Sequence, residues 1–247
     1  MKNNEGSVDP SKIFIVDDVA PSWLWSSWNN RIVSAQRWKY GLAGTRLDEQ
    51  RFFSIWVSQV GQHKGNRGPF PGDHEGICNY FNDLWQDVHL KNIIPDAEVL
   101  SILRCHFNGH FYNKQKLGLH YDFDGLNIWT MVYYLEGLDG DTVFFDNPQP
   151  DTNGNLQKPK EIFRSKWKLN RAVFFPSHYY HFAEHPSEGF RITLSFNYVL
   201  NDCNINLELK KDRGIVEIDK GNPDISDFLE ELDNLEKQQQ FIHKSHD

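Results

Sequence analysis

The spacing of apolar residues predicts that the chain begins with helices. Apolar residues recur every four positions after Pro21 and predict a helix that opens near this proline. A second helix is predicted over residues 74–90. The apolar positions are Leu24, Trp28 and Ile32 in the first helix, and Ile77, Phe81, Leu84, Trp85 and Val88 in the second. Ahead of both, the run KIFIV at residues 12–16 predicts a strand.

From residue 99 onward the pattern changes to an alternation of period two, which is typical of strands. The predicted strands are 99–108, 127–135, 142–146, 161–167, 171–176 and 190–199. Turn-rich stretches, GLDGD and NPQPDTNGN, interrupt them. Helices followed by many short strands predict a mainly β fold, an antiparallel sandwich or barrel with helices packed outside.

The composition changes again after residue 201. Residues 202–247 carry twelve acidic and six basic side chains, a net charge of −6 out of −8 for the whole chain. Asn222 and Pro223 predict a helix start, and an apolar stripe of helical spacing follows them. The predicted organisation is one domain over 1–201, with helical support over 1–96 and a strand core over about 97–200, and an acidic helical extension over 202–247.

Charge and cysteine content narrow the class of protein. The part before the extension has a net charge of only −2, which gives no strong attraction to nucleic acid or to an anionic membrane. Cys78, Cys105 and Cys203 are odd in number and far apart, so they predict neither a disulfide framework nor a Cys-x-x-Cys metal site. No apolar run suits a signal peptide or a membrane span. We therefore expect a cytoplasmic protein.

The first candidate for chemistry is the sequence His120-Tyr121-Asp122. Residues i and i+2 of an extended segment point to the same side, so the imidazole and the carboxylate can bind one ion. A pair of this kind is common by chance, and a surface turn is the alternative interpretation.

The second candidate lies in residues 174–200, which offer His178, His181 and His185 as a third ligand. The strand that follows places Arg191, Thr193, Ser195 and Asn197 on one side and apolar residues on the other. By itself this pattern also fits a strand with one wet face. Two histidines and one carboxylate would form the facial triad of non-haem iron oxygenases, which leaves three positions open for a 2-oxo acid and dioxygen.

Taken together, these features resemble the 2-oxoglutarate- and Fe(II)-dependent dioxygenase superfamily, in particular its prolyl 4-hydroxylase-like branch. The likeness covers roughly residues 97–200. Its elements are His120-Tyr121-Asp122, the strand 130–137, Gly140-Asp141-Thr142, Phe175-Pro176-Ser177, His181, and Arg191 ten residues later. The resemblance implies a double-stranded β-helix, or jelly roll, with flanking helices.

The resemblance also implies the metal ligands. His120, Asp122 and His181 would hold Fe(II), because His181 stands at the family distance from Arg191. His178 and His185 would then lie on the surface or the rim of the site.

A second set of residues would bind 2-oxoglutarate. Arg191 would hold its far carboxylate, since a buried acid needs a fixed cation that donates hydrogen bonds. The resemblance adds the hydroxyl of Tyr134 as a partner of the same carboxylate, although Tyr134 also fits a core tyrosine. Thr130 shares the strand face of Tyr134 and is expected in the same pocket. His110 stands where the family usually has a tyrosine near the co-substrate.

The implied reaction is hydroxylation of a substrate C–H bond, coupled to decarboxylation of 2-oxoglutarate to succinate. Fe(II), 2-oxoglutarate and dioxygen are required, and ascorbate is a further candidate cofactor. The alternative from another class is a jelly-roll protein that binds metal without turnover. A nucleic-acid substrate is not expected, because related demethylases carry a second arginine six residues after the first, where this chain has Asn197.

For the primary substrate we hypothesise a peptidyl proline on a protein partner. The branch resemblance favours it, and a run of basic residues over 158–171 could attract an acidic peptide. A solvated strand face explains the same run. A free amino acid or another small metabolite is the rival substrate.

Overall fold

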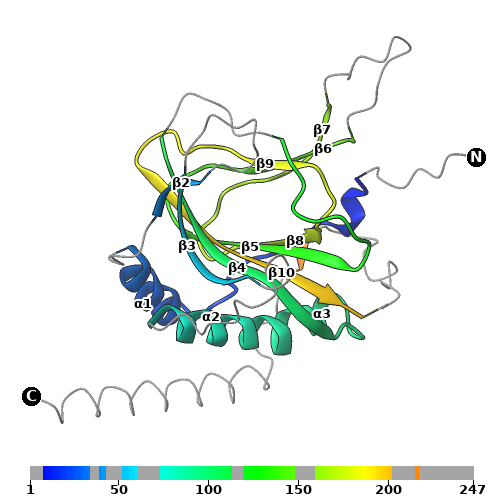
Figure 1. Ribbon diagram of the computed structural model, residues 1–247, viewed down its shortest axis with the longest axis horizontal. Coiled ribbons are helices and arrows are strands. Elements are labelled where there is room, and N and C mark those ends of the chain that lie inside the picture. Colours follow the sequence, from blue (N-terminus) through cyan, green and yellow to red (C-terminus); the bar gives the residue numbers. More distant parts are fainter. Residues whose placement is uncertain are drawn as a thin grey trace, which may run out of the picture.

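Two sheets, antiparallel except for the pairing of β1 with β11, form the body of the molecule (Figure 1). The computed structural model describes residues 8–33, 39–42, 52–59, 73–112, 119–147, 159–201 and 215–216. In these residues the large sheet has the order β11-β1-β8-β5-β10-β4-β3-β2 and the small sheet the order β7-β6-β9. The strands are β1 (Phe14–Val16), β2 (Lys39–Leu42), β3 (Phe52–Gln59), β4 (Val99–Phe111), β5 (Ile128–Glu136), β6 (Thr142–Phe145), β7 (Glu161–Ser165), β8 (Ala172–Pro176), β9 (His181–Ala183), β10 (Phe190–Leu200) and β11 (Ile215–Val216).

Helices cover the outer face of the large sheet (Figure 1). They are α1 (Ser22–Val33), α2 (Asp73–Leu84), the π-helix η2 (Trp85–Leu90) and α3 (Lys91–Ile93). The 3-10 turn η1 (Pro10–Lys12) lies apart from them, near the N-terminus (Figure 1). The helix predicted after Pro21 is confirmed, and its buried residues are the three that the periodicity selects. The second predicted helix is also present, with Phe81, Leu84, Trp85 and Val88 buried.

The alternation along β5 explains why the molecule has two apolar layers. Trp129, Met131 and Tyr133 point outward and pack with the helices. Val132 and Tyr134 point inward and pack with residues of the small sheet. A strand buried on both faces separates two cores, one under the helices and one between the sheets. The fold is mainly β and is the jelly roll that the sequence predicts.

The N-terminal part supplies more than helices. It contributes β1, β2 and β3, and the last two extend the large sheet beyond β4. The strands β2, β3, β9 and β11 were not predicted from the sequence. Of residues 202–247 the structure describes only β11, which pairs in parallel with β1. The helix predicted from Asn222 lies outside the described residues.

No helix among the described residues is long and apolar enough to cross a membrane.

Candidate functional site

A short antiparallel bridge pairs His120 with His181, the first residue of β9. The backbone N–H of His120 donates to the carbonyl of His181 at 3.0 Å, and the N–H of His181 donates to the carbonyl of His120 at 2.8 Å. Their ring centroids are 4.6 Å apart. The backbone N–H of Asp122 donates to the carbonyl of Ser177 at 2.9 Å. One possible ligand atom from each of His120, Asp122 and His181 lies within 4.8 Å of the other two.

No other group of three such residues was found in the described part of the chain. His185 lies apart from the three, with its Nδ1 3.1 Å from the carbonyl oxygen of Phe111. His178 packs edge to face against the ring of Tyr179. Of the three histidines that the sequence offers, the structure therefore places His181 beside His120 and Asp122.

His181 is in the form that binds a metal ion. Its Nδ1 lies 2.9 Å from the carbonyl oxygen of Tyr179, and a carbonyl only accepts, so Nδ1 carries the proton. The lone pair is then on Nε2. Burial, with the nearby His120, lowers the pKa of His181 to about 4, so its ring is neutral at neutral pH.

Asp122 stays ionised in spite of its burial. Burial alone would raise the pKa of Asp122, but Arg104 and the two histidines outweigh it and the pKa falls well below its usual range. Nη2 of Arg104 donates to Oδ1 at 2.5 Å, and the hydroxyl of Thr130 donates to Oδ2 at 2.9 Å. Two imidazoles and one ionised carboxylate are the donor set that non-haem Fe(II) prefers.

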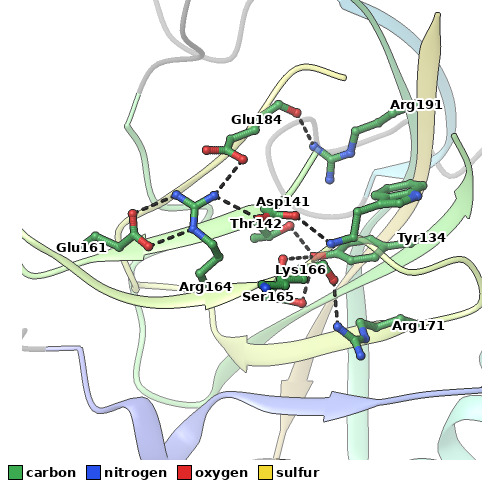
Figure 2. A network of polar contacts seen from close by, with 11 residues as sticks. Tyr134, Asp141, Thr142, Glu161, Arg164, Ser165, Lys166, Arg171, Glu184 and Arg191 are labelled. Atoms are coloured by element: carbon green, nitrogen blue, oxygen red, sulfur yellow. Dashed lines mark hydrogen bonds and ion pairs between the residues drawn. The ribbon is translucent and has the colours of Figure 1, made fainter. Parts of the chain in front are cut away.

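Arg191 is buried on the inward face of β10, with 2% of its surface exposed. Nη1 donates to the carbonyl of Glu184 at 3.1 Å, and Nε has no acceptor among the described residues (Figure 2). The guanidinium carbon lies 5.7 Å from the ring centre of Tyr134 and 5.2 Å from that of Trp167. Burial lowers the pKa of Arg191 to about 10, which leaves it a cation at neutral pH. A buried cation with an unused N–H is a ready site for a carboxylate.

The turn between β5 and β6 makes room for Arg191. A Cβ at Gly140 would lie 2.8 Å from the carbonyl oxygen of Glu184 and 2.9 Å from Cδ of Arg191. Trp167 holds its position through its backbone N–H, which donates to Asp141 at 2.8 Å, and through its stacking on Tyr134, with ring centres 4.5 Å apart. The side chains of Arg191, Tyr134 and Trp167 therefore pack against one another.

The ring and the hydroxyl of Tyr134 have separate contacts in the structure. Its hydroxyl bonds the hydroxyls of Thr142 at 2.9 Å and Ser165 at 3.1 Å (Figure 2). Thr142 and Ser165 belong to the small sheet, and both form hydrogen bonds with the Tyr134 hydroxyl. Tyr134 thus offers Arg191 its ring, and its hydroxyl ties the two sheets together.

The hydroxyl of Thr130 contacts the predicted metal ligand Asp122. It shares the inward face of β5 with Tyr134, as the alternation requires. Its hydroxyl bonds Asp122 and the hydroxyl of Ser177, and it accepts from Nδ2 of Asn197 at 2.8 Å. In the structure the hydroxyl of Thr130 therefore helps to hold the carboxylate of Asp122.

His110 lies between the two groups of residues. It stands opposite Arg191 in the pairing of β4 with β10. Burial first, then the charges of Arg191, His185 and His120, lower the pKa of His110 well below its usual value. The ring is therefore neutral at neutral pH. It lies close enough to both Arg191 and His120 that their charges lower its pKa.

Inward-facing polar residues of two paired strands form a stripe from Arg191 to Asp122, which we call the polar stripe. Its members are His110, Asn108, His106 and Arg104 on β4, and Arg191, Thr193, Ser195 and Asn197 on β10. The sequence analysis identified the β10 side. It missed Arg104, although the same alternation runs along β4, and it missed Trp167, for which no local signal exists.

Comparison with known proteins bears on the fold. No family model matches the sequence, and no curated protein matches it. An oxidoreductase of the 2OG-Fe(II) oxygenase family from Burkholderia pseudomallei aligns with a TM-score of 0.53 at 12% identity, over 76% of this chain and 85% of that one. A prolyl-4-hydroxylase from Pseudomonas putida aligns with a TM-score of 0.45 at 16% identity, over 77% of this chain and 93% of that one. The chain has the fold of this oxygenase family.

Proposed function

We propose that this protein is a 2-oxoglutarate-dependent Fe(II) dioxygenase that hydroxylates a C–H bond of its substrate. The observation that carries the proposal is the placement of two separate sites on one inward face. His120, Asp122 and His181 bring three ligand atoms within 4.8 Å of one another, and the polar stripe joins them to buried Arg191.

The side chains present fit the two groups. His120, Asp122 and His181 would hold Fe(II), since the carboxylate is ionised and Nε2 of His181 carries a lone pair. Arg191 would bind the far carboxylate of 2-oxoglutarate, with Nε as a donor that no described residue uses. When bound, the iron supplies the redox chemistry with dioxygen and 2-oxoglutarate that ends in succinate, carbon dioxide and a hydroxylated product.

The chain's own residues would bind and orient 2-oxoglutarate and would exclude water from the site. The rings of Tyr134 and Trp167 keep the guanidinium of Arg191 in one place and shield it from solvent. Neutral His110 provides a hydrogen-bonding ring between the co-substrate arginine and the metal ligands. A dry, fixed surround strengthens each of these charged contacts.

The basic run over 158–171 does not support an acidic peptide as substrate. Arg164 pairs with Asp141, Glu161 and Glu184 at 3.0, 2.9 and 2.8 Å. Arg171 and Lys168 pair with Asp17 at 2.5 and 3.1 Å. These acids of the same chain already satisfy much of the charge, and Lys158 lies outside the described residues. Peptidyl proline therefore rests on the branch resemblance, with a free amino acid or small metabolite as its rival.

The reaction class is tested by turnover of 2-oxoglutarate. Incubation with Fe(II), 2-oxoglutarate, dioxygen and ascorbate is expected to yield succinate, and omission of iron is expected to abolish it. Bound iron without any succinate, with or without added substrate candidates, would support the non-catalytic jelly-roll protein instead.

The substrate class is tested in the same assay. Proline-containing peptides and free proline are offered in parallel, and products are searched by mass for one added oxygen. Oxygen gained by a peptide supports the peptidyl-proline hypothesis. Oxygen gained only by a free metabolite contradicts it.

Replacing Gly140 with alanine is expected to weaken 2-oxoglutarate binding by displacing Arg191. The new Cβ would meet Cδ of Arg191 at 2.9 Å, at a backbone φ of +108°. Gly189→Ala is the matched control, because its φ is +65° and nothing lies within 4 Å of the added Cβ. Gly189→Ala should cost about 1–2 kcal/mol of stability through its left-handed backbone. Gly140→Ala should cost more, because its Cβ also meets the carbonyl oxygen of Glu184 at 2.8 Å. Only Gly140→Ala should also raise the Kd for 2-oxoglutarate, and equal Kd values in both variants would contradict the role of this turn.

A further inference from the structure

Four side chains form a closed ring of hydrogen bonds that includes the carboxylate of Asp122. Nη2 of Arg104 donates to Oδ1 of Asp122 at 2.5 Å, and Nε donates to Oδ1 of Asn197 at 2.8 Å. Nδ2 of Asn197 donates to the hydroxyl of Thr130 at 2.8 Å. The hydroxyl of Thr130 donates to Oδ2 of Asp122 at 2.9 Å and closes the ring.

The register of three strands creates this ring. Arg104 on β4 stands opposite Asn197 on β10, and Asn197 stands opposite Thr130 on β5. The three side chains thus make one row across the inward face, and Asp122 reaches the row from the loop before β5. Asn197 and Thr130 are fully buried, so their polar atoms need the partners they find here.

The ring holds a side chain whose backbone lies outside the strands. The carboxylate belongs to an irregular segment, where the backbone N–H of Asp122 makes a single hydrogen bond to Ser177. The ring contacts both carboxylate oxygens and so restricts the rotation of the side chain. A ligand that is already oriented loses less entropy when an ion binds.

We propose that Arg104, Asn197 and Thr130 are positioning residues that orient Asp122 for the metal ion. The inference rests on the proposed function, since it assumes the metal site of His120, Asp122 and His181. Two effects of Arg104 oppose each other, because its charge repels a cation while its fork orients the carboxylate. The ring also holds Asp122 through the uncharged Thr130 and Asn197, which orient the carboxylate without repelling a cation. We therefore expect orientation to be the larger effect, and variants of the charged and the uncharged members separate the two effects.

The experiment titrates Co(II), a probe with visible absorption bands that report its coordination, into the full-length protein and its variants. Thr130→Val, Asn197→Leu and Arg104→Met are each expected to weaken Co(II) binding by roughly 10- to 100-fold and to alter the bands. Arg104→Lys keeps the charge and loses the fork, so it should recover only part of the affinity.

Arg171→Met is the matched control. Arg171 also forms a partly buried pair with an aspartate, Asp17, through bonds of 2.5 and 2.9 Å, and it lies outside the ring. It should lose comparable stability in thermal unfolding and bind Co(II) like the original protein. Thermal unfolding of every variant separates loss of orientation from loss of fold.

The outcomes distinguish the two proposals. Tighter Co(II) binding by Arg104→Met would mean that charge repulsion dominates, and unchanged binding by Thr130→Val and Asn197→Leu would mean that the ring does not orient Asp122. Either result overturns the positioning role and leaves the metal site standing. Failure of the original protein to bind Co(II), or full binding by Asp122→Ala, would overturn the metal site and the positioning role with it.

Discussion

Replacing Arg191 with methionine is expected to weaken 2-oxoglutarate binding strongly while metal binding persists. Methionine keeps much of the buried volume and removes the cation that the far carboxylate requires. Losing one partner of a buried charge pair costs on the order of 2–5 kcal/mol, which corresponds to roughly 30- to 4,000-fold in Kd. The measurement is an anaerobic titration of 2-oxoglutarate into the Fe(II)-loaded protein, followed by its charge-transfer absorption.

Arg191→Lys serves as the comparison. A lysine keeps the charge but cannot offer the planar fork or the flat cation that contacts the rings of Tyr134 and Trp167. We expect an intermediate Kd. An unchanged Kd in Arg191→Met would show that the far carboxylate is held elsewhere.

The second large effect is expected from the metal ligands. His120→Ala, Asp122→Ala and His181→Ala should each lower iron content from about one ion per chain to near zero and abolish succinate formation, because a facial triad has no spare ligand. Iron content and succinate are measured on the same preparations.

His185→Ala is the control for this series. Its ring lies on the rim, near the carbonyl oxygen of Phe111, and outside the group of three ligand atoms. It should keep its iron. Normal iron content in His181→Ala, or its loss in His185→Ala, would contradict the ligand assignment.

Periodicity predicts features of this molecule that depend on one segment at a time. The alternation along 190–199 places Arg191 and Asn197 on the inward face, and both are inward and buried. The four-residue spacing of Leu24, Trp28 and Ile32 likewise selects the residues that α1 buries. In α1 one face meets the core and the other does not, whereas β10 is buried on both faces and one face is polar and the other apolar. In each case the alternation of residue type separates the two faces.

Features that depend on contacts between segments were not predicted from the sequence. Thr130 shares a strand face with Tyr134, yet its hydroxyl bonds Asp122, which arrives from a loop. Trp167 reaches Arg191 only through the packing of the small sheet on the large one. The strand β9 has three residues, too few for an alternation to be visible.

Arg104 is an intermediate case. The alternation along β4 sets Arg104, His106 and His110 on the face opposite to Cys105 and Phe107. That signal was available, because a strand with several polar residues on one face predicts a wet or functional side. Its pairing with Asp122 still required the register between β4 and β10.

The most direct test of the account is a crystal structure of the protein with Mn(II) and 2-oxoglutarate, grown without oxygen. Anomalous scattering locates the metal ion independently of the protein model. The account predicts one Mn(II) bound by His120, Asp122 and His181, with 2-oxoglutarate along the polar stripe and its far carboxylate on Arg191. A metal ion bound elsewhere, or a 2-oxoglutarate that does not contact Arg191, would contradict it.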